Sequence, residues 1–272
     1  MDTVSLVTDS SACLEGHDHA TPVRVVPIVI HLPDGDVKDG ERGVAERVYE
    51  SLDRHEPVKS SAPTAVDYVE AIEGSDSEAV VVITPAIEFT TMYRNATIAA
   101  ELTRRAVAVV DSRTAAAAHG LVVERAARVA ADGGSMDDVV HTARDAAARA
   151  ELVATLEGMD QLRMSGRVPS AAVDLARHLG IRPVFRLRQG AVERVGVPRS
   201  SHTALERVAR EAGRRGVDRA ESRVVFHAAD PVRASTLSRR LGIAKATEFS
   251  PSMGIHTGPG LVGVAWIAPE PA

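Results

Sequence analysis

The chain has 272 residues, of which 44% are hydrophobic and 25% charged, a profile typical of one large or two medium globular domains. Its net charge is −5, so no overall field attracts nucleic acid or an anionic bilayer. Aromatic residues make up only 3%, too few for the stacking platforms that bind single-stranded nucleic acid. Any pocket is therefore expected to be lined mainly by aliphatic side chains.

The single cysteine, Cys13, excludes an internal disulfide and is in keeping with a reducing compartment. No basic start precedes an apolar stretch at the N-terminus, and no apolar run reaches the length of a membrane span. We therefore expect a cytoplasmic protein that has no integral association with a membrane.

Apolar runs alternate with helical patterns along the first half of the chain. Strands are expected at 4–7, 23–32 (bent at Pro27), 79–83 and 106–110. Helices are expected at 44–54, 65–72, 92–105, 121–131 and 135–149. Asp34-Gly35 predicts a hairpin turn, and Thr64 and Ser135 are expected to cap the helices that follow them.

The alternating pattern restarts near residue 152. Strands are expected at 151–156, 222–227, 244–249 and 261–268, and a helix at 201–215. Two short helices are predicted within 157–180, and a hairpin around Gln189-Gly190. The alternation predicts an α/β protein with mainly parallel sheets, and the restart predicts two α/β domains, 1–151 and 152–272.

Two predicted strands end in the same dipeptide, Asp9-Ser10 and Asp111-Ser112. Ligands of open parallel sheets bind outside the carboxyl ends of the strands, so these four residues are candidates for a polar crevice. The alternative is that each one caps the segment that follows it. A further alternative is a hydrolase or phosphotransferase that uses Asp9 and Asp111, although neither has a second acid next to it in the sequence.

Several motifs of nucleotide and metal enzymes are absent from the sequence. It contains no GxGxxG after the first strand, no GxxxxGK and no GxSxG. Cys13, His17 and His19 match no standard spacing of metal ligands. We therefore expect neither a nucleotide cofactor nor a metal ion.

Six segments, in order, resemble the DegV family of bacterial lipid-binding proteins. They are VTDSSACL, RVVPIVIHLPDG, VKSSAPTAVDYVEAI, VAVVDSRTAAAAHGLVVERAARVAADGGS, the stretch from LEGMDQLRMSGRVP to GAVERVGVPRS, and GIHTGPGLVGVAW. Together they cover nearly the whole chain. The resemblance implies two α/β domains that hold a long-chain fatty acid between them.

By the same resemblance, the protein is a binding subunit and not an enzyme. It would present the carboxyl end of the fatty acid to a separate ATP-dependent kinase, which makes an acyl phosphate. Burial of a hydrocarbon contributes about 0.8 kcal/mol per methylene, so a sixteen-carbon chain gains on the order of 12 kcal/mol before ordering costs. Neutral donors would hold the carboxylate without locking its oxygens in a salt bridge.

The resemblance maps the donors for the carboxylate onto Ser60, Ser61, Thr90 or Thr91, and His256. It gives Arg199 a role in engaging the kinase, and Arg167 a role in holding a turn. Each of these has a simpler alternative: the two serines as turn formers before Pro63, the threonines as a helix cap, and His256 and Arg199 as surface residues.

The sequence departs from the family pattern in the loop TPAIEFTTMY, where Pro85, Glu88 and Phe89 replace small polar residues. If Glu88 turned inward, it would repel a carboxylate. A divergent ligand is therefore one alternative. An interaction module with a filled interior and no lipid is another.

Overall fold

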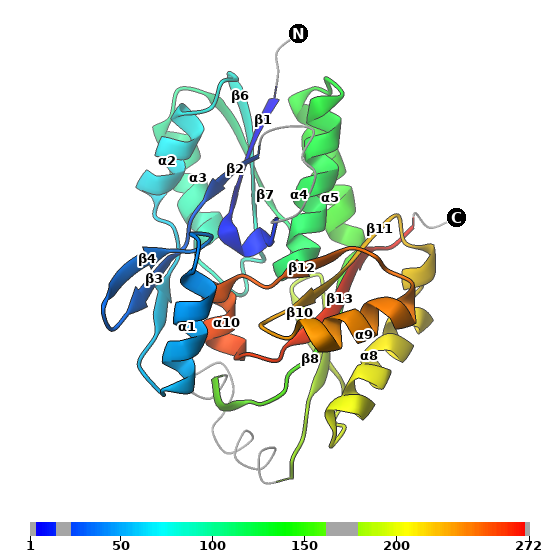
Figure 1. The fold of residues 1–272 in the computed structure, drawn as a ribbon. Coiled ribbons are helices and arrows are strands. Elements are labelled where there is room, and N and C mark those ends of the chain that lie inside the picture. The colour runs from blue at the N-terminus through cyan, green and yellow to red at the C-terminus, as the bar shows by residue number, and fades with distance from the viewer. Residues whose placement is uncertain (1–3, 15–22, 162–178, 270–272) are drawn as a thin grey trace.

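The computed structural model describes residues 4–14, 23–161 and 179–269 (Figure 1). The first sheet, sheet A, has the strand order β2-β1-β6-β7, and all its pairs are parallel. Its strands are β1 (Val4–Asp9), β2 (Val23–Val26), β6 (Ala79–Thr84) and β7 (Ala106–Asp111). The valine-rich runs form parallel strands because helices cover both faces of the sheet.

Helices α2 (Ala65–Glu73) and α3 (Met92–Leu102) cover one face of sheet A, and α4 (Ala116–Ala131) and α5 (Met136–Arg149) cover the other. Alternate residues of one strand enter the two cores, as Val80 and Val81 show. The predicted caps are confirmed, because Thr64 and Ser135 each accept a hydrogen bond in a capping box.

The second sheet, sheet C, has the order β10-β9-β8-β13-β11-β12. Its strands are β8 (Ala150–Thr155), β9 (Val184–Arg188), β10 (Ala191–Gly196), β11 (Ser222–His227), β12 (Ala246–Glu248) and β13 (Val262–Ile267). Helices α4 and α5 lie between sheets A and C, while α8 (Ser201–Arg214) and α9 (Pro231–Leu241) cover the outer face.

The α/β prediction is confirmed, and sheet A is parallel as expected, but sheet C is mostly antiparallel. Only its β11–β12 pair is parallel. Helix α9 joins β11 to β12, and such a crossover is what a parallel pair requires. The two-residue turn at Gln189-Gly190 forces β9 and β10 to be antiparallel, and β13 runs back between β8 and β11. The division into two domains at residue 152 stays a prediction.

A small antiparallel sheet, sheet B, has the order β4-β3-β5. Its strands are β3 (Val29–Leu32), β4 (Gly35–Lys38) and β5 (Lys59–Ser61). Pro27 divides the predicted strand 23–32 more sharply than expected, because β2 belongs to sheet A and β3 to sheet B. Leu32 pairs with Gly35, so the hairpin turn lies one position before the predicted one, at Pro33-Asp34.

Helix α1 (Val44–Asp53) packs against α10 (Pro251–Thr257), a short helix that brings the C-terminal part of the chain to sheet B. The sequence pattern does not predict a helix in this segment. Gly254 is required there, because a Cβ atom at this position would lie 2.6 Å from the hydroxyl of Tyr49.

Some predictions fall outside the described residues. Most of the helix pair expected within 157–180, and with it Arg167, belongs to the undescribed range 162–178, and His17 and His19 belong to 15–22. Among the residues that are described, no helix combines the length and apolar character needed to cross a bilayer.

Gly120 allows α4 to pack closely on the short 3-10 helix η1 (Ser10–Ala12), since a Cβ atom there would lie 2.1 Å from the carbonyl oxygen of Ala12. We expect Gly120→Ala to destabilise the protein by about 1–3 kcal/mol through overpacking. The control is Gly213→Ala on α8, where a Cβ meets nothing within 4 Å. This control should gain about 0.5–1 kcal/mol. Urea unfolding measures both changes, and equal stability of the two variants would contradict the prediction.

Candidate functional site

Ser60 and His256 come together although 196 residues separate them in the chain. The Oγ atom of Ser60 on β5 lies 3.4 Å from Nε2 of His256 on α10, and the pair is partly buried. Sheet B supplies the serine and α10 supplies the histidine, so the two halves of the chain meet here. A hydroxyl and an imidazole at this spacing can bind one carboxylate between them without a cation.

The second predicted serine, Ser61, does not join this pair. Neighbouring residues of a strand point to opposite sides, and the Oγ atom of exposed Ser61 lies 2.7 Å from Nε2 of His31 instead. Nδ1 of His31 lies in turn 2.7 Å from Oδ1 of Asp36. Ser61 thus belongs to an exposed polar group on sheet B.

Thr90 and Thr91 lie just before α3 and are not bonded to Ser60. The Thr90 hydroxyl accepts a hydrogen bond from the backbone N–H of Met92 at 3.4 Å, which is the capping alternative for this residue. Thr91 is exposed and its side chain makes no capping bond. Asn95 of α3 nevertheless donates to the carbonyl oxygen of Pro63 at 2.7 Å, so this helix lies beside the segment that follows Ser60.

An open cleft of about 510 Å³ is lined in part by the three residues that follow His256 in the chain. The end of α1, the segment after β8 and the residues after His256 line it: Leu52, Asp53, His55, Glu56, Glu157, Gly158, Asp160, Gln161, Thr257, Gly258 and Pro259. Its lining mixes charged, polar and apolar residues, and neither Ser60 nor His256 is among them.

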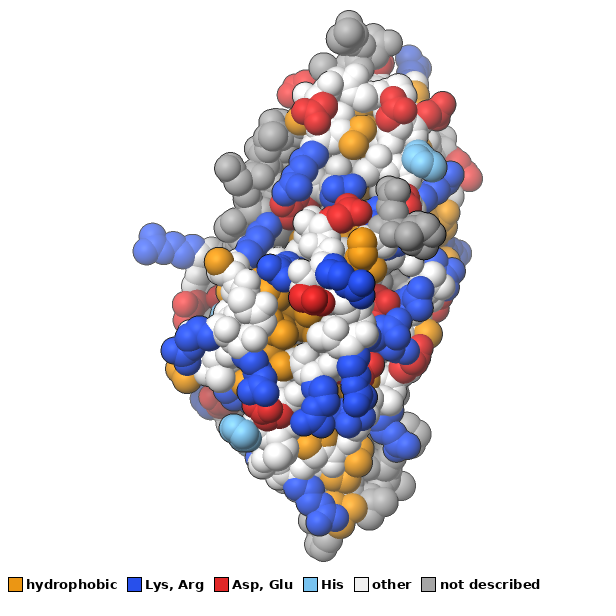
Figure 2. Space-filling model, turned by 90° about the vertical axis from the view of Figure 1, so that its right-hand side faces the viewer, with side chains coloured by type: hydrophobic (Ala, Val, Ile, Leu, Met, Phe, Trp, Pro, Cys, Tyr) orange, Lys and Arg blue, Asp and Glu red, His pale blue; other side chains and the backbone are white. Residues whose placement is uncertain are grey.

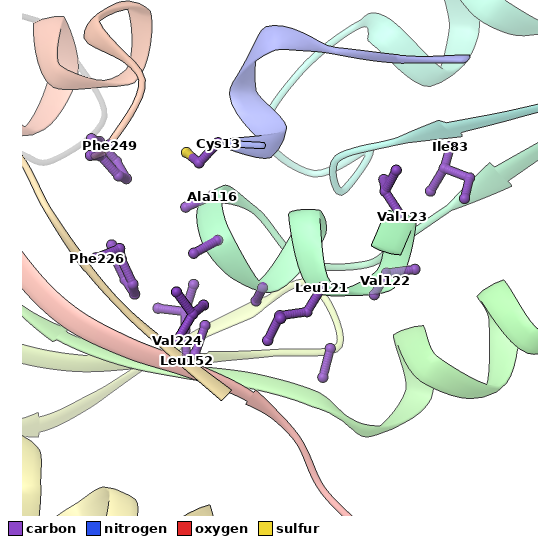
Figure 3. Close-up of a cluster of buried hydrophobic side chains, with 14 of the residues drawn as sticks. Cys13, Ile83, Ala116, Leu121, Val122, Val123, Leu152, Val224, Phe226 and Phe249 are labelled. Carbon is purple, nitrogen blue, oxygen red and sulfur yellow. The ribbon is translucent and has the colours of Figure 1, made fainter. Parts of the chain in front are cut away.

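A large apolar cluster lies on the inner side of α10, the helix that carries His256. Ile255 and Phe249 are buried members of it, and Met253 packs against it. The cluster continues through α4 to sheet C, as Figure 3 shows for Ala116, Phe226 and Phe249. The rings of Phe226 and Phe249 stack with their centroids 6.0 Å apart. His256 is therefore preceded in the chain by a residue buried in the apolar cluster and followed by residues that line the cleft.

Asp9, at the end of β1, caps the short helix η1. This is the capping role that the sequence offered as the alternative to a place in a polar crevice. The exposed fraction of Asp9 is 0%, and Oδ1 accepts from the N–H of Ser11 at 3.0 Å and from its hydroxyl at 2.5 Å. Burial raises the pKa of Asp9 to about 6. Ser10 donates to Asp39 at 2.7 Å. A carboxylate sealed in this way does not support the hydrolase alternative.

Buried His119 of α4 lies beside Asp9. Its Nε2 atom is 3.0 Å from the hydroxyl of Thr8 and 3.8 Å from Oδ2 of Asp9, so Thr8 is its hydrogen-bond partner and Asp9 is not. Burial lowers the pKa of His119 to about 3. This imidazole is therefore neutral near pH 7, and the contact with Asp9 is not an ion pair there.

At the second strand end, half-buried Asp111 accepts from the N–H of Arg113 at 2.8 Å. Desolvation raises its pKa, while backbone hydrogen bonds lower it. Ser112 is fully buried, and its N–H donates to the carbonyl oxygen of Thr84 at 3.0 Å. The bond from Ser112 to Thr84 joins the residue after β7 to the end of β6.

Glu88 is turned away from the Ser60–His256 pair. Nη2 of Arg113 donates to Glu88 at 2.9 Å and to the carbonyl oxygen of Gln189 at 2.8 Å. A Cβ atom on Gly190 would lie 2.3 Å from Glu88, so the side chain rests on the β9–β10 turn. The inward orientation that would repel a carboxylate is not the one observed.

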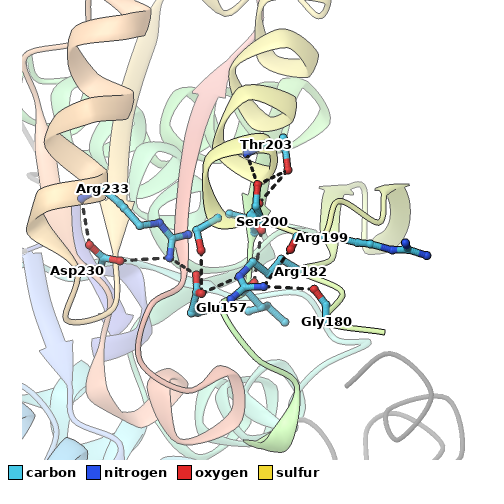
Figure 4. A network of polar contacts seen from close by, with 11 residues as sticks. Glu157, Gly180, Arg182, Arg199, Ser200, Thr203, Asp230 and Arg233 are labelled. Carbon is cyan, nitrogen blue, oxygen red and sulfur yellow. Dashed lines mark hydrogen bonds and ion pairs between the residues drawn. The ribbon is translucent and has the colours of Figure 1, made fainter. Parts of the chain in front are cut away.

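Exposed Arg199 extends from a polar network around Glu157 (Figure 4). Glu157 accepts from Arg182 at 2.7 Å, from Ser201 at 2.8 Å and from Arg233 at 2.5 Å. Arg182 also donates to the backbone carbonyl of Arg199 at 3.4 Å. The network therefore fixes the backbone of Arg199, while its side chain points to solvent.

Acidic and basic side chains are interspersed on the face shown in Figure 2. In the C-terminal half many arginines have carboxylate partners, as Arg215 has in Glu151 at 2.7 and 2.9 Å. Such pairing differs from the basic stripe that binds nucleic acid. Within the described ranges, no three His, Cys, Asp or Glu residues form a group that could hold a metal ion.

Sequence reasoning missed two buried groups at this end of the molecule, Asp39 and His119. Asp39 follows a turn-rich segment, and its neighbours Lys38 and Gly40 are exposed. His119 occupies one position in an alanine-rich helix. The helix predicted at 121–131 begins after His119, whereas α4 begins at Ala116; only that longer helix places His119 at helical spacing from the buried Ala116 and Val123.

Comparisons with known proteins agree over nearly the whole chain. The profile of the DegV family, described as uncharacterised proteins, matches residues 3–269. A DegV domain-containing protein of Mycobacterium tuberculosis is 30% identical over 276 residues, which cover 96% of this chain and 96% of that protein.

Two solved structures share the fold. A fatty-acid-binding DegV family protein from Thermus thermophilus superposes with a TM-score of 0.85 at 22% identity and covers 98% of this chain and 100% of its own. The fatty acid kinase B3 protein of Streptococcus pneumoniae, loaded with linoleic acid, gives a TM-score of 0.86 at 20% identity with the same coverage. Together with the profile match, these findings show that the chain belongs to the DegV family.

Proposed function

We propose that this protein binds a long-chain fatty acid with its carboxylate at the Ser60–His256 pair and its hydrocarbon chain in the apolar cluster. The observation that carries the proposal is this pair itself: its side chains lie 3.4 Å apart on β5 and α10, and Ile255, next to His256, is buried in the apolar cluster. Two of the solved structures of the same fold are described as binding fatty acids or loaded with one. Thr90 and Thr91 remain candidates for further contacts with the carboxylate.

We further propose that the bound carboxylate is phosphorylated by a separate ATP-dependent kinase. A carboxylate oxygen would attack the γ-phosphorus of the ATP that the kinase holds, and ADP would leave, so the product is an acyl phosphate. Neutral donors suit this role, because they orient the carboxylate without neutralising the attacking oxygen. Since the reaction consumes ATP, we assign it to the cytoplasm.

The binding step is tested by mass spectrometry of the purified protein under denaturing conditions. We expect one co-purified fatty acid per chain, or stoichiometric loading after incubation with palmitate and oleate. A protein that contains no acid and takes up neither of the two would refute the proposal. Loading with acid but no acyl phosphate in the presence of the kinase would refute only the second step.

Arg199 is proposed to contact the kinase, and the structure leaves its side chain exposed beside a groove next to α8. We expect Arg199→Glu to raise the KM for the kinase about tenfold through charge reversal, with fatty-acid binding unchanged. Arg194→Glu, an exposed position on β10, is the matched control. Kinase titrations at saturating acid measure the effect, and an equal KM for both variants would remove Arg199 from the interface.

A further inference from the structure

A buried carboxylate, Asp39, ties the helix that carries His256 to the N-terminal half of the chain. Its exposed fraction is 5%. Its Oδ2 atom accepts hydrogen bonds from the hydroxyls of Ser250 at 2.5 Å, Ser252 at 2.6 Å and Ser10 at 2.7 Å. Three hydroxyl donors on one carboxylate oxygen are charge-assisted bonds, which are stronger than those between neutral groups.

The donors come from two distant parts of the chain. Ser10 follows β1 and also accepts from the N–H of Ile28 at 3.1 Å. Ser250 is the N-cap of α10 and Ser252 lies in its first turn, and the Ser250 hydroxyl makes no capping bond to its own helix. The hydroxyl of Ser250 donates to Asp39 instead, so this carboxylate fixes the position of the first residues of α10.

Asp39 and Ser60 are carried by the same small sheet. Asp39 directly follows β4, and its N–H donates to the carbonyl oxygen of Ile28 at 2.9 Å. Ser60 lies on β5, on the other side of the central strand β3, where it pairs with Ile30. The sheet therefore sets the distance between the carboxylate and the serine.

Ser252 and His256 are four residues apart on α10, so they lie on the same face of that helix. Asp39 accepts a hydrogen bond from Ser252, and Ser60 contacts His256. Between them, Gly254 packs against the ring of Tyr49 from α1. Helix α10 is thus fixed to the N-terminal half at three successive points along its length.

We propose that Asp39 is a positioning residue for His256: through Ser250 and Ser252 it sets the place and rotation of α10, and so the approach of the imidazole to Ser60. Without the carboxylate, three buried or half-buried hydroxyls lose their acceptor, and α10 can shift as a unit. A seven-residue helix has too few internal hydrogen bonds to hold its own position. The inference rests on the proposed function only where it concerns the fatty acid.

The direct test uses the protein without any ligand. In protein with labelled histidine, we expect a nuclear Overhauser contact between the His256 ring and the Ser60 side chain, assigned by its loss in His256→Gln. Asp39→Ala, which removes the acceptor of all three hydroxyls, should abolish this contact in a folded protein, and Ser252→Ala should weaken it. Asp34→Ala, which removes an exposed carboxylate in the same hairpin, should leave it intact.

A contact that persists in folded Asp39→Ala would overturn the proposal. If Asp39→Ala does not fold, Ser252→Ala decides, because it removes one donor and keeps the carboxylate. This test needs no fatty acid, so it stands even if the proposed function fails.

If the protein binds palmitate, Asp39→Ala should weaken binding about tenfold, but less than twofold in a His256→Ala background, since both changes remove one interaction. Equal losses in the two backgrounds would show a general structural role and contradict the proposal.

Discussion

His256→Ala is expected to reduce acyl phosphate formation by about 10- to 100-fold, which corresponds to the loss of one charge-assisted hydrogen bond to the carboxylate. The imidazole of His256 on α10 lies 3.4 Å from the hydroxyl of Ser60. The effect should appear both in the affinity for the acid and in the rate with saturating kinase, because the same bond holds and orients the carboxylate.

The measurement is ADP release by the kinase with palmitate-loaded protein. His141→Ala is the matched control, since His141 is an exposed histidine on α5. Thermal unfolding of both variants verifies that they are folded. If the two variants turned over at the same rate, His256 would have no part in the site.

The second large effect is on the pH dependence of the free energy of unfolding, to which the buried side chains of His119 and Asp9 contribute in opposite directions. The pKa of His119 is about 3 in the folded state and ordinarily 6.5, so the unfolded state binds more protons between these values. Stability is therefore lost as the pH falls below 6.5, by about 3 kcal/mol at pH 4.5. Asp9 acts in the opposite sense, because its pKa rises from 3.8 to about 6 on folding.

The folded state therefore binds the proton of Asp9 more tightly, and this contribution grows by about 2 kcal/mol as the pH falls from 7.5 to 4.5. Relative to the wild type, His119→Gln should gain stability over this range, and Asp9→Asn should lose it. Urea unfolding at pH 7.5 and 4.5 measures both differences. Relative stabilities that do not change with pH, or that change in the same direction, would contradict these pKa shifts.

Local patterns were sufficient for much of the fold. The valine-rich runs that became β1 and β6 are buried on both faces, and the capping residues Thr64 and Ser135 act over three residues. The directions of the strands in sheet C could not be predicted in the same way. They depend on where β13 inserts, and its partners β8 and β11 are distant in the sequence.

The candidate site was less accessible to sequence reasoning. Ser60 and His256 were chosen by resemblance, because contacts across 196 residues leave no local signal. Helix α10 was missed because Gly254 interrupts a segment that holds only seven residues, and tertiary contacts from Tyr49 and Asp39 stabilise it instead. The partner of Glu88, Arg113, lies 25 residues away and could not be identified from the loop sequence.

The most direct test of the account is carbon NMR of palmitate labelled with ¹³C at its carboxyl group and bound to this protein. We predict one bound carboxyl signal at one equivalent, with a chemical shift that differs from that of free palmitate and moves on Ser60→Ala and on His256→Ala. A bound signal that neither substitution moves would place the carboxylate elsewhere. No bound signal at all would contradict the central claim that this protein holds a fatty acid.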